Sequence, residues 1–455
     1  MLGVTVSRDS THSVHPLRKV RATDSIVDRD RRAFLKIAIA QGIAAPVALA
    51  TLESPAHANP ATVQQLATSP ARKGAMRLSS PKIGDLHASG AIVRDFADPH
   101  LELLRLLREA AEIEHALMIQ YLFCAFSLRK PYSDLAGYGS ATADNMIGVA
   151  IQEMQHLSAV NRFLVALGSC PHLDRQDFPY EPDIYPFVFQ LEPLSKAALA
   201  KYVYTEAPAD VFNVSLAKNK EDKAFAERVL VELGAENKTN QVGSLYRSVL
   251  DMLSEIDGIP DGPLTSDEVA KWKEDLRRIM DEGETDHFNF FRDVFEARHP
   301  AFRGKTDVWS LSPTDAFYPS HDLTRNPTAY IGHPNQIEKP KALILAWLGN
   351  LHYWIALSTL DYAYRTGDDG ALDHATAQMM TAIWPIAIEL PQYQAGLPFD
   401  PLSMGYALGA NPKQTKRIIA AFGREALNFA TAIEHRLPEN YDKKSTEDLI
   451  AYMRA

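Results

Sequence analysis

The chain has 455 residues, of which 46% are hydrophobic and 23% are charged, and its formal net charge at pH 7 is −10. This length is enough for one large or two medium domains, and an acidic chain with no basic patch is a poor candidate for nucleic-acid binding. It contains two cysteines, Cys124 and Cys170, which argues against a cysteine-held iron–sulfur cluster or zinc site. Their places near the ends of two predicted helices put them at opposite ends of a helical bundle, so they are not expected to form a disulfide.

The first 58 residues resemble an export signal. Residues 31–36 read Arg-Arg-Ala-Phe-Leu-Lys, an apolar stretch follows at 37–52, and residues 56–58 read Ala-His-Ala, the form of a cleavage site. We therefore expect 1–58 to be a twin-arginine signal peptide, with the twin-arginine export machinery as a partner and a periplasmic or secreted mature protein. The alternative is a disordered basic leader. The apolar stretch is short, which favours a removed peptide over an anchor, and no later segment is expected to span a bilayer.

Residues 59–97 are rich in Ser, Ala, Pro and Gly and are predicted to be a flexible leader. Residues 101–128 are predicted to form one long helix, because apolar residues recur at three- and four-residue spacing. Glu114 lies in the middle of this helix, and Tyr121, seven residues later, projects from the same face. A carboxylate on a buried face is costly unless something compensates its charge, and a metal ion would do so. The alternative is that Glu114 and its neighbours form the wet face of a half-exposed helix.

Two later predicted helices each contain a Glu-x-x-His motif, formed by Glu153 with His156 and by Glu284 with His287. The carboxylate and imidazole of each pair are one turn apart, so they point the same way. One such motif is expected by chance, but two in long apolar helices, with a carboxylate helix upstream, match a bundle that holds two metal ions in its core. Carboxylate and imidazole ligands suit iron or manganese.

A further carboxylate is expected from the region between the two motifs. Glu206 ends a predicted helix at 194–206 that Ser195 opens as N-cap. It is the first candidate, and Glu236 is the second. A solvent-exposed Glu206 is an equally good interpretation, since most glutamates are exposed.

The rest of the chain is expected to be mainly helical. Periodicity predicts further helices at 225–256 (with Gly234 as a break), 341–365, 371–390 and 413–437, whereas 301–340 is predicted to be irregular. The aromatic loop at 168–193 either lines the mouth of a pocket or is a surface crossover. Four later histidines could suggest a second metal site or a haem, but their spacing supports neither, and structural roles are favoured: His333, His352, His374 and His435.

Several motifs resemble the ferritin-like family that includes the iminophenyl-pyruvate dimer synthases of bisindole pathways. They occur at residues 112–116 (Glu-Ile-Glu-His-Ala), 120–122, 149–156, 205–208, 242–246 and 284–288, and the run 351–394 resembles the helical tail of those proteins. The resemblance covers most of residues 95–405. It implies an all-α fold: a ferritin-like four-helix bundle at 98–300 with a helical C-terminal extension at 301–455 packed on it.

The same resemblance implies a non-haem site for two iron ions, or for iron with manganese. Its expected metal ligands are Glu114, Glu153, His156, Glu206, Glu284 and His287. Tyr121 is the expected catalytic residue, as a donor of a proton or an electron, although a core tyrosine with a bonded hydroxyl is the commoner case. Ser244 departs from the family pattern, because relatives often have a carboxylate or amide there. Whether Glu112 or His115 also binds metal is open.

The expected function is that of an exported di-iron oxidoreductase that uses dioxygen on a small substrate derived from an amino acid or amine. Imine dimerisation is not transferred from the family, because the chain is shorter than the pigment-pathway enzymes and carries the export signal. Two alternatives are an iron-oxidising or metal-handling protein without an organic substrate, and a metal-free structural or assembly partner. The aromatic loops and the helical tail suit a substrate pocket. Whether the chain forms a homo-oligomer is open.

Overall fold

The computed structural model describes residues 92–175, 189–234, 241–257 and 262–455. The described residues form helices and no strand, apart from two isolated β-bridges, so the all-α prediction is confirmed. The predicted signal peptide and most of the predicted leader lie outside these residues, and both stay predictions. The leader's predicted end at residue 97 falls just before Asp98, which caps the first described helix.

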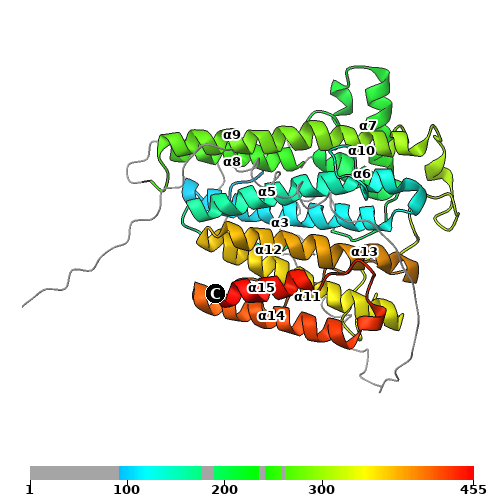
Figure 1. Cartoon of the computed structure of the whole chain (residues 1–455). Coiled ribbons are helices and arrows are strands. Elements are labelled where there is room, and N and C mark those ends of the chain that lie inside the picture. Colours follow the sequence, from blue (N-terminus) through cyan, green and yellow to red (C-terminus); the bar gives the residue numbers. More distant parts are fainter. Residues whose placement is uncertain (1–91, 176–188, 235–240, 258–261) are drawn as a thin grey trace, which may run out of the picture.

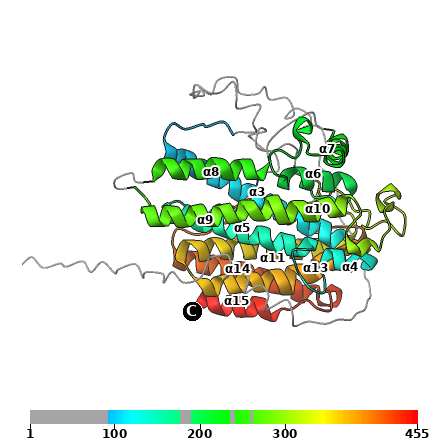
Figure 2. The same cartoon turned by 90° about the horizontal axis from the view of Figure 1, so that it is seen from above.

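The N-terminal part contains the helices that carry the motifs. They are α3 (Pro99–Ser127), the short α4 (Ser133–Ala136), α5 (Met146–Ala166), α6 (Lys196–Glu206), α7 (Lys220–Leu233), α8 (Val242–Ile256), α9 (Ser266–Glu282), the π-helical turn η4 (Gly283–His287) and α10 (Phe288–Phe295). α9, η4 and α10 follow one another as one long rod, and α8 and α6 lie end to end beside it (Figure 2). With α3 and α5, these two composite rods complete a four-rod bundle.

Local capping explains where the main helices begin. Asp98 accepts hydrogen bonds from two backbone N–H groups of α3, and Asn145 does the same for one in α5. Thr265 and Glu268 form a reciprocal capping box at the start of α9. Gly234, at φ 65°, ends α7 in the left-handed region that glycine tolerates best. The predicted break at this glycine is confirmed, and the stretch 225–256 contains parts of two helices.

The C-terminal part is a second helical layer. It contains α11 (Pro340–Thr366), α12 (Asp369–Gln378), the π-helical turn η7 (Met379–Ile383), α13 (Trp384–Glu389), α14 (Pro412–Ala432) and α15 (Lys444–Arg454). It lies on one side of the α3–α5 pair, and α8 and α9 lie on the other (Figure 1). The stretch 301–340 is irregular apart from short 3-10 turns, as predicted, whereas α15 was not predicted.

One helix of the described residues, α11, is long and apolar enough to cross a membrane, with a mean hydropathy of 1.3 over 18 residues. The expectation that no later segment has this character therefore needs correction. However, 83% of that window is buried inside the protein. Other parts of the chain cover its apolar surface, as expected for a helix in the core of a bundle.

The two cysteines are not bonded to each other, as predicted, and two of the four later histidines, His352 and His374, make internal contacts. Cys124 is buried and Cys170 is exposed, and neither forms a disulfide. His352 is buried between Gln378 and Tyr441, at 2.8 and 2.6 Å. His374 packs on the ring of Tyr452, while His333 and His435 are exposed. None of the four belongs to a group of potential metal ligands found in the described part of the chain.

Candidate metal centre

Five of the six predicted ligands meet in the core of the bundle. α3 supplies Glu114, α5 supplies Glu153 and His156, the last residue of α6 is Glu206, and η4 supplies His287. Each of these side chains is at most 3% exposed. Burying three carboxylates together is very costly unless positive charge compensates them.

The five residues form two overlapping groups that share Glu153. In the first group, His156 Nδ1 lies 2.8 Å from Glu153 Oε2 and 3.4 Å from Glu114 Oε2. In the second, His287 Nδ1 lies 3.0 Å from Glu153 Oε1 and 3.6 Å from Glu206 Oε2. Within each group the potential ligand atoms all lie within 4.8 Å of one another. The two oxygens of Glu153 thus face one histidine each.

The chemistry of these atoms fits a pair of metal ions. Glu114 Oε2, Glu153 Oε1 and His287 Nδ1 are buried and lie at ion-pair distances within the cluster, but none of them forms a hydrogen bond within the described residues. Buried polar atoms are normally hydrogen-bonded, and these three face the shared centre instead. Nitrogen and carboxylate oxygen are the ligands that iron and manganese take in helical bundles.

Two buried tyrosines fix the outer carboxylates. The Tyr246 hydroxyl donates to Glu114 Oε1, and the Tyr121 hydroxyl donates to Glu206 Oε1. Each bond leaves the other oxygen of its glutamate facing a histidine. Burial, and then the adjacent carboxylate, raise the pKa of both tyrosines, so both stay protonated as donors. Tyr121, predicted as a catalytic donor, therefore lies against a candidate ligand. Tyr246 was not predicted as a site residue. It ends the 242–246 motif, but only the packing of α8 against α3 shows that its hydroxyl reaches Glu114.

Protonated histidines offset the negative charge of the buried carboxylates in the cluster. Burial opposes charge on His287, but Glu153 and Glu206 raise its pKa to about 10. Burial likewise opposes charge on His156, and Glu153 and Glu114 hold its pKa well above the usual range. Burial and the neighbouring Glu153 raise the pKa of Glu114 to about 7. In this state, protons on two imidazoles occupy the electrostatic role that two cations would fill.

Glu284 is the predicted ligand that joins neither group. Its carboxylate borders the same cavity, but its Oε1 accepts a hydrogen bond from Arg247 at 2.7 Å. The reason is the π-helical turn η4, which has more residues per turn than an α-helix. Side chains three residues apart therefore diverge further, and Glu284 and His287 do not share a face. Ser244, where the sequence departs from the family pattern, is buried and accepts a weak bond from Arg247.

Glu282 is a contact of the site that the sequence did not reveal. Its Oε2 lies 3.2 Å from His156 Nε2, on the side of the ring away from the cluster, and its Oε1 accepts from Gln152. Burial opposes its ionisation, but the bond to His156 lowers the pKa of Glu282 to about 2. A carboxylate behind a ligand histidine orients the ring and fixes its tautomer. Gln152, by donating to Glu282, supports this carboxylate and does not contact the histidine itself.

The remaining candidates lie elsewhere. Glu112 is half-buried and pairs with His172 at 2.5 Å. The buried His115 accepts from or donates to the Tyr353 hydroxyl at 2.6 Å, on the side of α3 that faces α11. The structure therefore places neither of them in the cluster. Glu236 lies outside the described residues, and Glu206 occupies the position for which both were considered.

Little free space surrounds the cluster. The cavity that it borders holds about 10 Å³, close to the minimum for one water molecule. Gly243 and Gly283 form part of its wall, and a Cβ at Gly243 would lie 1.9 Å from Glu284 Oε1. An organic molecule fits beside the cluster only if side chains move.

Comparison with known proteins agrees with this arrangement. Residues 107–293 match the family model described as ferritin-like. The fold is ferritin-like. The chain is also 26% identical over 352 residues to a dichlorochromopyrrolate synthase from Lentzea aerocolonigenes, an alignment that covers 64% of this chain and 34% of that protein. The chain thus spans about a third of the length of this curated relative. No solved structure matches it significantly.

The match includes every residue of the two groups. Residues 107–293 begin within α3 and end within α10, so Glu114 and His287 both lie inside them. α11 to α15 lie beyond the match. The ferritin-like part therefore contains the candidate metal centre, and the second helical layer is an addition to it.

Proposed function

We propose that this protein is a di-iron oxidoreductase that uses dioxygen to oxidise a small organic substrate, derived from an amino acid or amine. The observation that supports it most is the sharing of Glu153 between two buried groups of ligands. One bridging carboxylate between two sites is the arrangement expected for a pair of ions in a helical bundle. The chemistry that two iron ions supply is the reduction of dioxygen.

The residues of the chain would hold and tune the two ions. Glu114 and His156 would bind one, Glu206 and His287 the other, and Glu153 both. Glu284 is the remaining carboxylate within reach, and it would join by leaving Arg247. The four glutamates then provide four negative charges, which match two divalent cations.

The tyrosines and the apolar core support this chemistry. Tyr121 and Tyr246 each hold one carboxylate oxygen and leave the other for an ion. Tyr121 also packs edge-on against Tyr202, with ring centroids 4.8 Å apart. Its hydroxyl donates to Glu206 and could therefore supply a proton on that side of the centre. The surrounding apolar side chains exclude bulk water, which strengthens each of these bonds.

An organic substrate is supported by two further observations. The curated relative is named as a synthase of dichlorochromopyrrolate, an organic product. The second helical layer is not needed to hold metal, and it forms half of an apolar pocket against α3 and α5. The narrow space at the cluster favours a second candidate, a metal-handling protein that oxidises iron without an organic substrate.

Metal loading of the purified protein tests the proposal. Metal-free protein is titrated anaerobically with Fe²⁺, and iron per chain is measured after desalting. We expect two ions per chain for the natural sequence and fewer than one for Glu153→Gln, because this change affects both groups. Glu112→Gln is the matched control, since Glu112 pairs with His172 outside the cluster, and it should retain two ions. Equal iron contents in the two variants would refute the site.

Oxygen uptake then separates the two candidates. Iron-loaded protein is exposed to dioxygen with and without amino acids and amines, and consumption is followed with an electrode. An oxidoreductase should consume oxygen over several turnovers only when its substrate and a reductant are present. A metal-handling protein should consume an amount fixed by the iron added, whatever organic molecule is present.

A further inference from the structure

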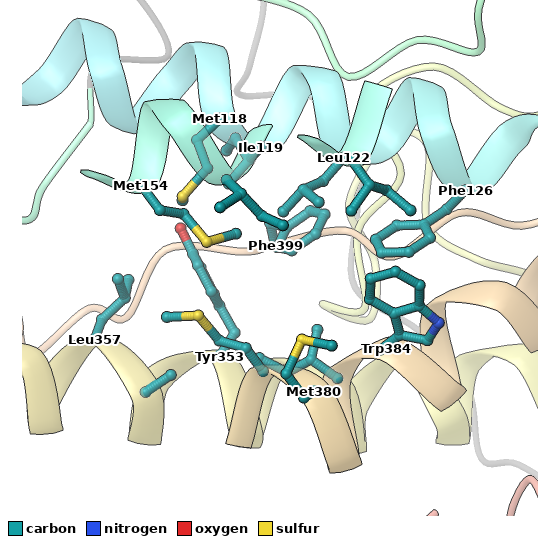
Figure 3. A pocket seen from close by; sticks show the side chains of 15 residues that line it. Met118, Ile119, Leu122, Phe126, Met154, Tyr353, Leu357, Met380, Trp384 and Phe399 are labelled. Carbon is teal, nitrogen blue, oxygen red and sulfur yellow. The ribbon is translucent and has the colours of Figure 1, made fainter. Parts of the chain in front are cut away.

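An apolar pocket between the two layers of the molecule is not explained by the metal centre. α3 and α5 form one wall, and α11, η7, α13 and Phe399 form the other. In Figure 3 the side chains of Met118, Met154, Met380 and Trp384 surround one open space. The pocket holds about 50 Å³, five times the space at the cluster, and about 580 Å³ when the space out through its mouth is included.

No polar atom is exposed on the wall of this pocket. The one hydroxyl among its lining residues, on Tyr353, is bonded to His115 Nε2 at 2.6 Å. A water molecule in such a space has no hydrogen-bond partner, and apolar cavities of this kind stay dry or take apolar ligands. Filling the pocket with apolar surface is therefore favourable.

The composition of the wall indicates an aromatic ligand. Four of the chain's 11 methionines line it, namely Met118, Met154, Met379 and Met380, together with the rings of Phe126, Tyr353, Trp384 and Phe399. Thioethers make favourable contacts with aromatic rings, and their flexible side chains adapt to an occupant. A pocket smaller than the roughly 150 Å³ cavities that hold benzene can thus widen to accept one ring.

The depth of the pocket indicates a small molecule rather than a protein or a membrane. Its floor residues on α3, Met118, Ile119 and Leu122, are at most 8% exposed. Half-buried side chains of η7 and α5, such as Met154 and Met380, form the mouth above them. Only a molecule that inserts between the layers reaches the floor.

We infer that this pocket binds the single aromatic ring of a small organic molecule, on a face of α3 and α5 different from the one that presents Glu114 and Glu153. The same pocket supports an organic substrate in the proposed function, but it contains no candidate metal ligand, so the inference is independent of the metal centre. It can therefore be tested on metal-free protein, and its failure would not count against the metal centre.

The test is a titration of the metal-free full chain, labelled with ¹³C in the methionine methyl groups, with toluene as the probe. We expect saturable shifts of the Met118, Met154, Met379 and Met380 signals and none for Met252 and Met453, which lie outside the pocket. Methylcyclohexane, of similar size without an aromatic ring, should bind at least threefold more weakly. Equal or tighter binding of methylcyclohexane would overturn the aromatic assignment, and absent or uniform shifts would overturn the site.

A matched pair of variants tests whether toluene binds in this pocket. Met380→Trp fills the mouth of the pocket, whereas Met404→Trp makes the same change at a residue that is 62% exposed and outside it. We expect at least tenfold weaker toluene binding for M380W and a change within twofold for M404W. Ala356→Leu, which fills the pocket from its buried α11 wall, is a second test if M380W alters the fold. Unchanged binding in folded M380W and A356L proteins would refute the site.

Discussion

Two histidines supply the positive charge of the cluster when no metal is present. His287 has a pKa of about 10 because the effect of the Glu153 and Glu206 carboxylates exceeds that of burial. His156 is held well above its usual pKa by Glu153 and Glu114 in the same way. Since a metal ion binds neutral imidazole, both protons must leave when ions bind.

This exchange predicts proton release on metal binding. At pH 7 the two histidines should release two protons per chain, and Glu114, whose pKa is about 7, should add a fraction of a third. Isothermal titration of metal-free protein with Fe²⁺ or Mn²⁺ in buffers of different ionisation enthalpy measures the number. Affinity should rise with pH in the same proportion. Release of fewer than one proton would show that the histidines are neutral beforehand or do not bind metal.

Regular helices explain why the structure brings several of the predicted ligands together. Glu153 and His156 lie in uninterrupted α5, where a spacing of three residues defines one face. Glu114 was indicated because it is a carboxylate in the middle of an otherwise apolar helix. Glu284 was not placed correctly, because no sequence signal shows that a π-helical turn begins at Gly283. Glu282 was missed for the same reason, since helical phase around the motif cannot be read through such a turn.

The composite rod of α6 and α8 places two elements at the cluster. α6 ends at Glu206 and α8 begins at Val242, and residues of both border the cavity. The break lets a carboxylate at a helix end face the core, while the first turn of α8 contributes Gly243 and Tyr246. The sequence indicated the helices, but not that two of them form one side of the bundle, because nothing local fixes how separate helices align.

Where α8 meets η4, Arg247 pairs with Glu284 and, on the proposed function, would compete with a metal ion for it. The pair is partly solvent-exposed, so it contributes at most about 1 kcal/mol, or roughly fivefold in affinity. We expect Arg247→Met to raise the affinity for the second ion by up to about fivefold, measured by competition with a chelator. The effect should vanish in the Glu284→Gln background, since the arginine then has no carboxylate to withhold. An equal gain in both backgrounds would assign the effect to general charge instead.

In the C-terminal extension, hydrophobic periodicity predicted some helices well and missed others. α11 was indicated nearly to the residue, whereas the stretch 371–390 contains the π-helical turn η7, and the 11-residue α15 was missed. α15 is short, and its buried residues Leu449, Ile450 and Met453 cover α14 and α12 only after the chain has folded back. The pocket also could not be predicted, because its two walls come from segments about 200 residues apart in the sequence.

At the scale of the whole molecule, a buried neutral histidine connects the parts of the extension. His352 on α11 bonds to Gln378 on α12 and to Tyr441 before α15. Burial lowers its pKa from 6.5 to about 4. In the unfolded chain this group takes up a proton below pH 6.5, but in the native state it does so only near pH 4. Stability is therefore lost as pH falls through this window.

This linkage predicts acid sensitivity of the fold. The shift corresponds to about 3 kcal/mol of unfolding free energy lost between pH 6.5 and 4. Denaturant unfolding at pH 7 and pH 4.5 measures it. His352→Gln should have a smaller loss between these two values, whatever its stability at pH 7, and the exposed His333→Gln should behave as the natural sequence does. An unchanged pH dependence in H352Q would assign the acid sensitivity to other groups.

The α3 helix has protein on both of its sides, and 21 of its 29 residues are buried. Its Ile119 and Phe126 face the extension, while Glu114 and Tyr121 face the cluster. A fragment that stopped at residue 300 would leave the first pair in contact with water, on the same rod that positions the second. We therefore expect the bundle and the extension to unfold in one transition, although they are separate in the sequence. Neither part should fold well when it is expressed alone.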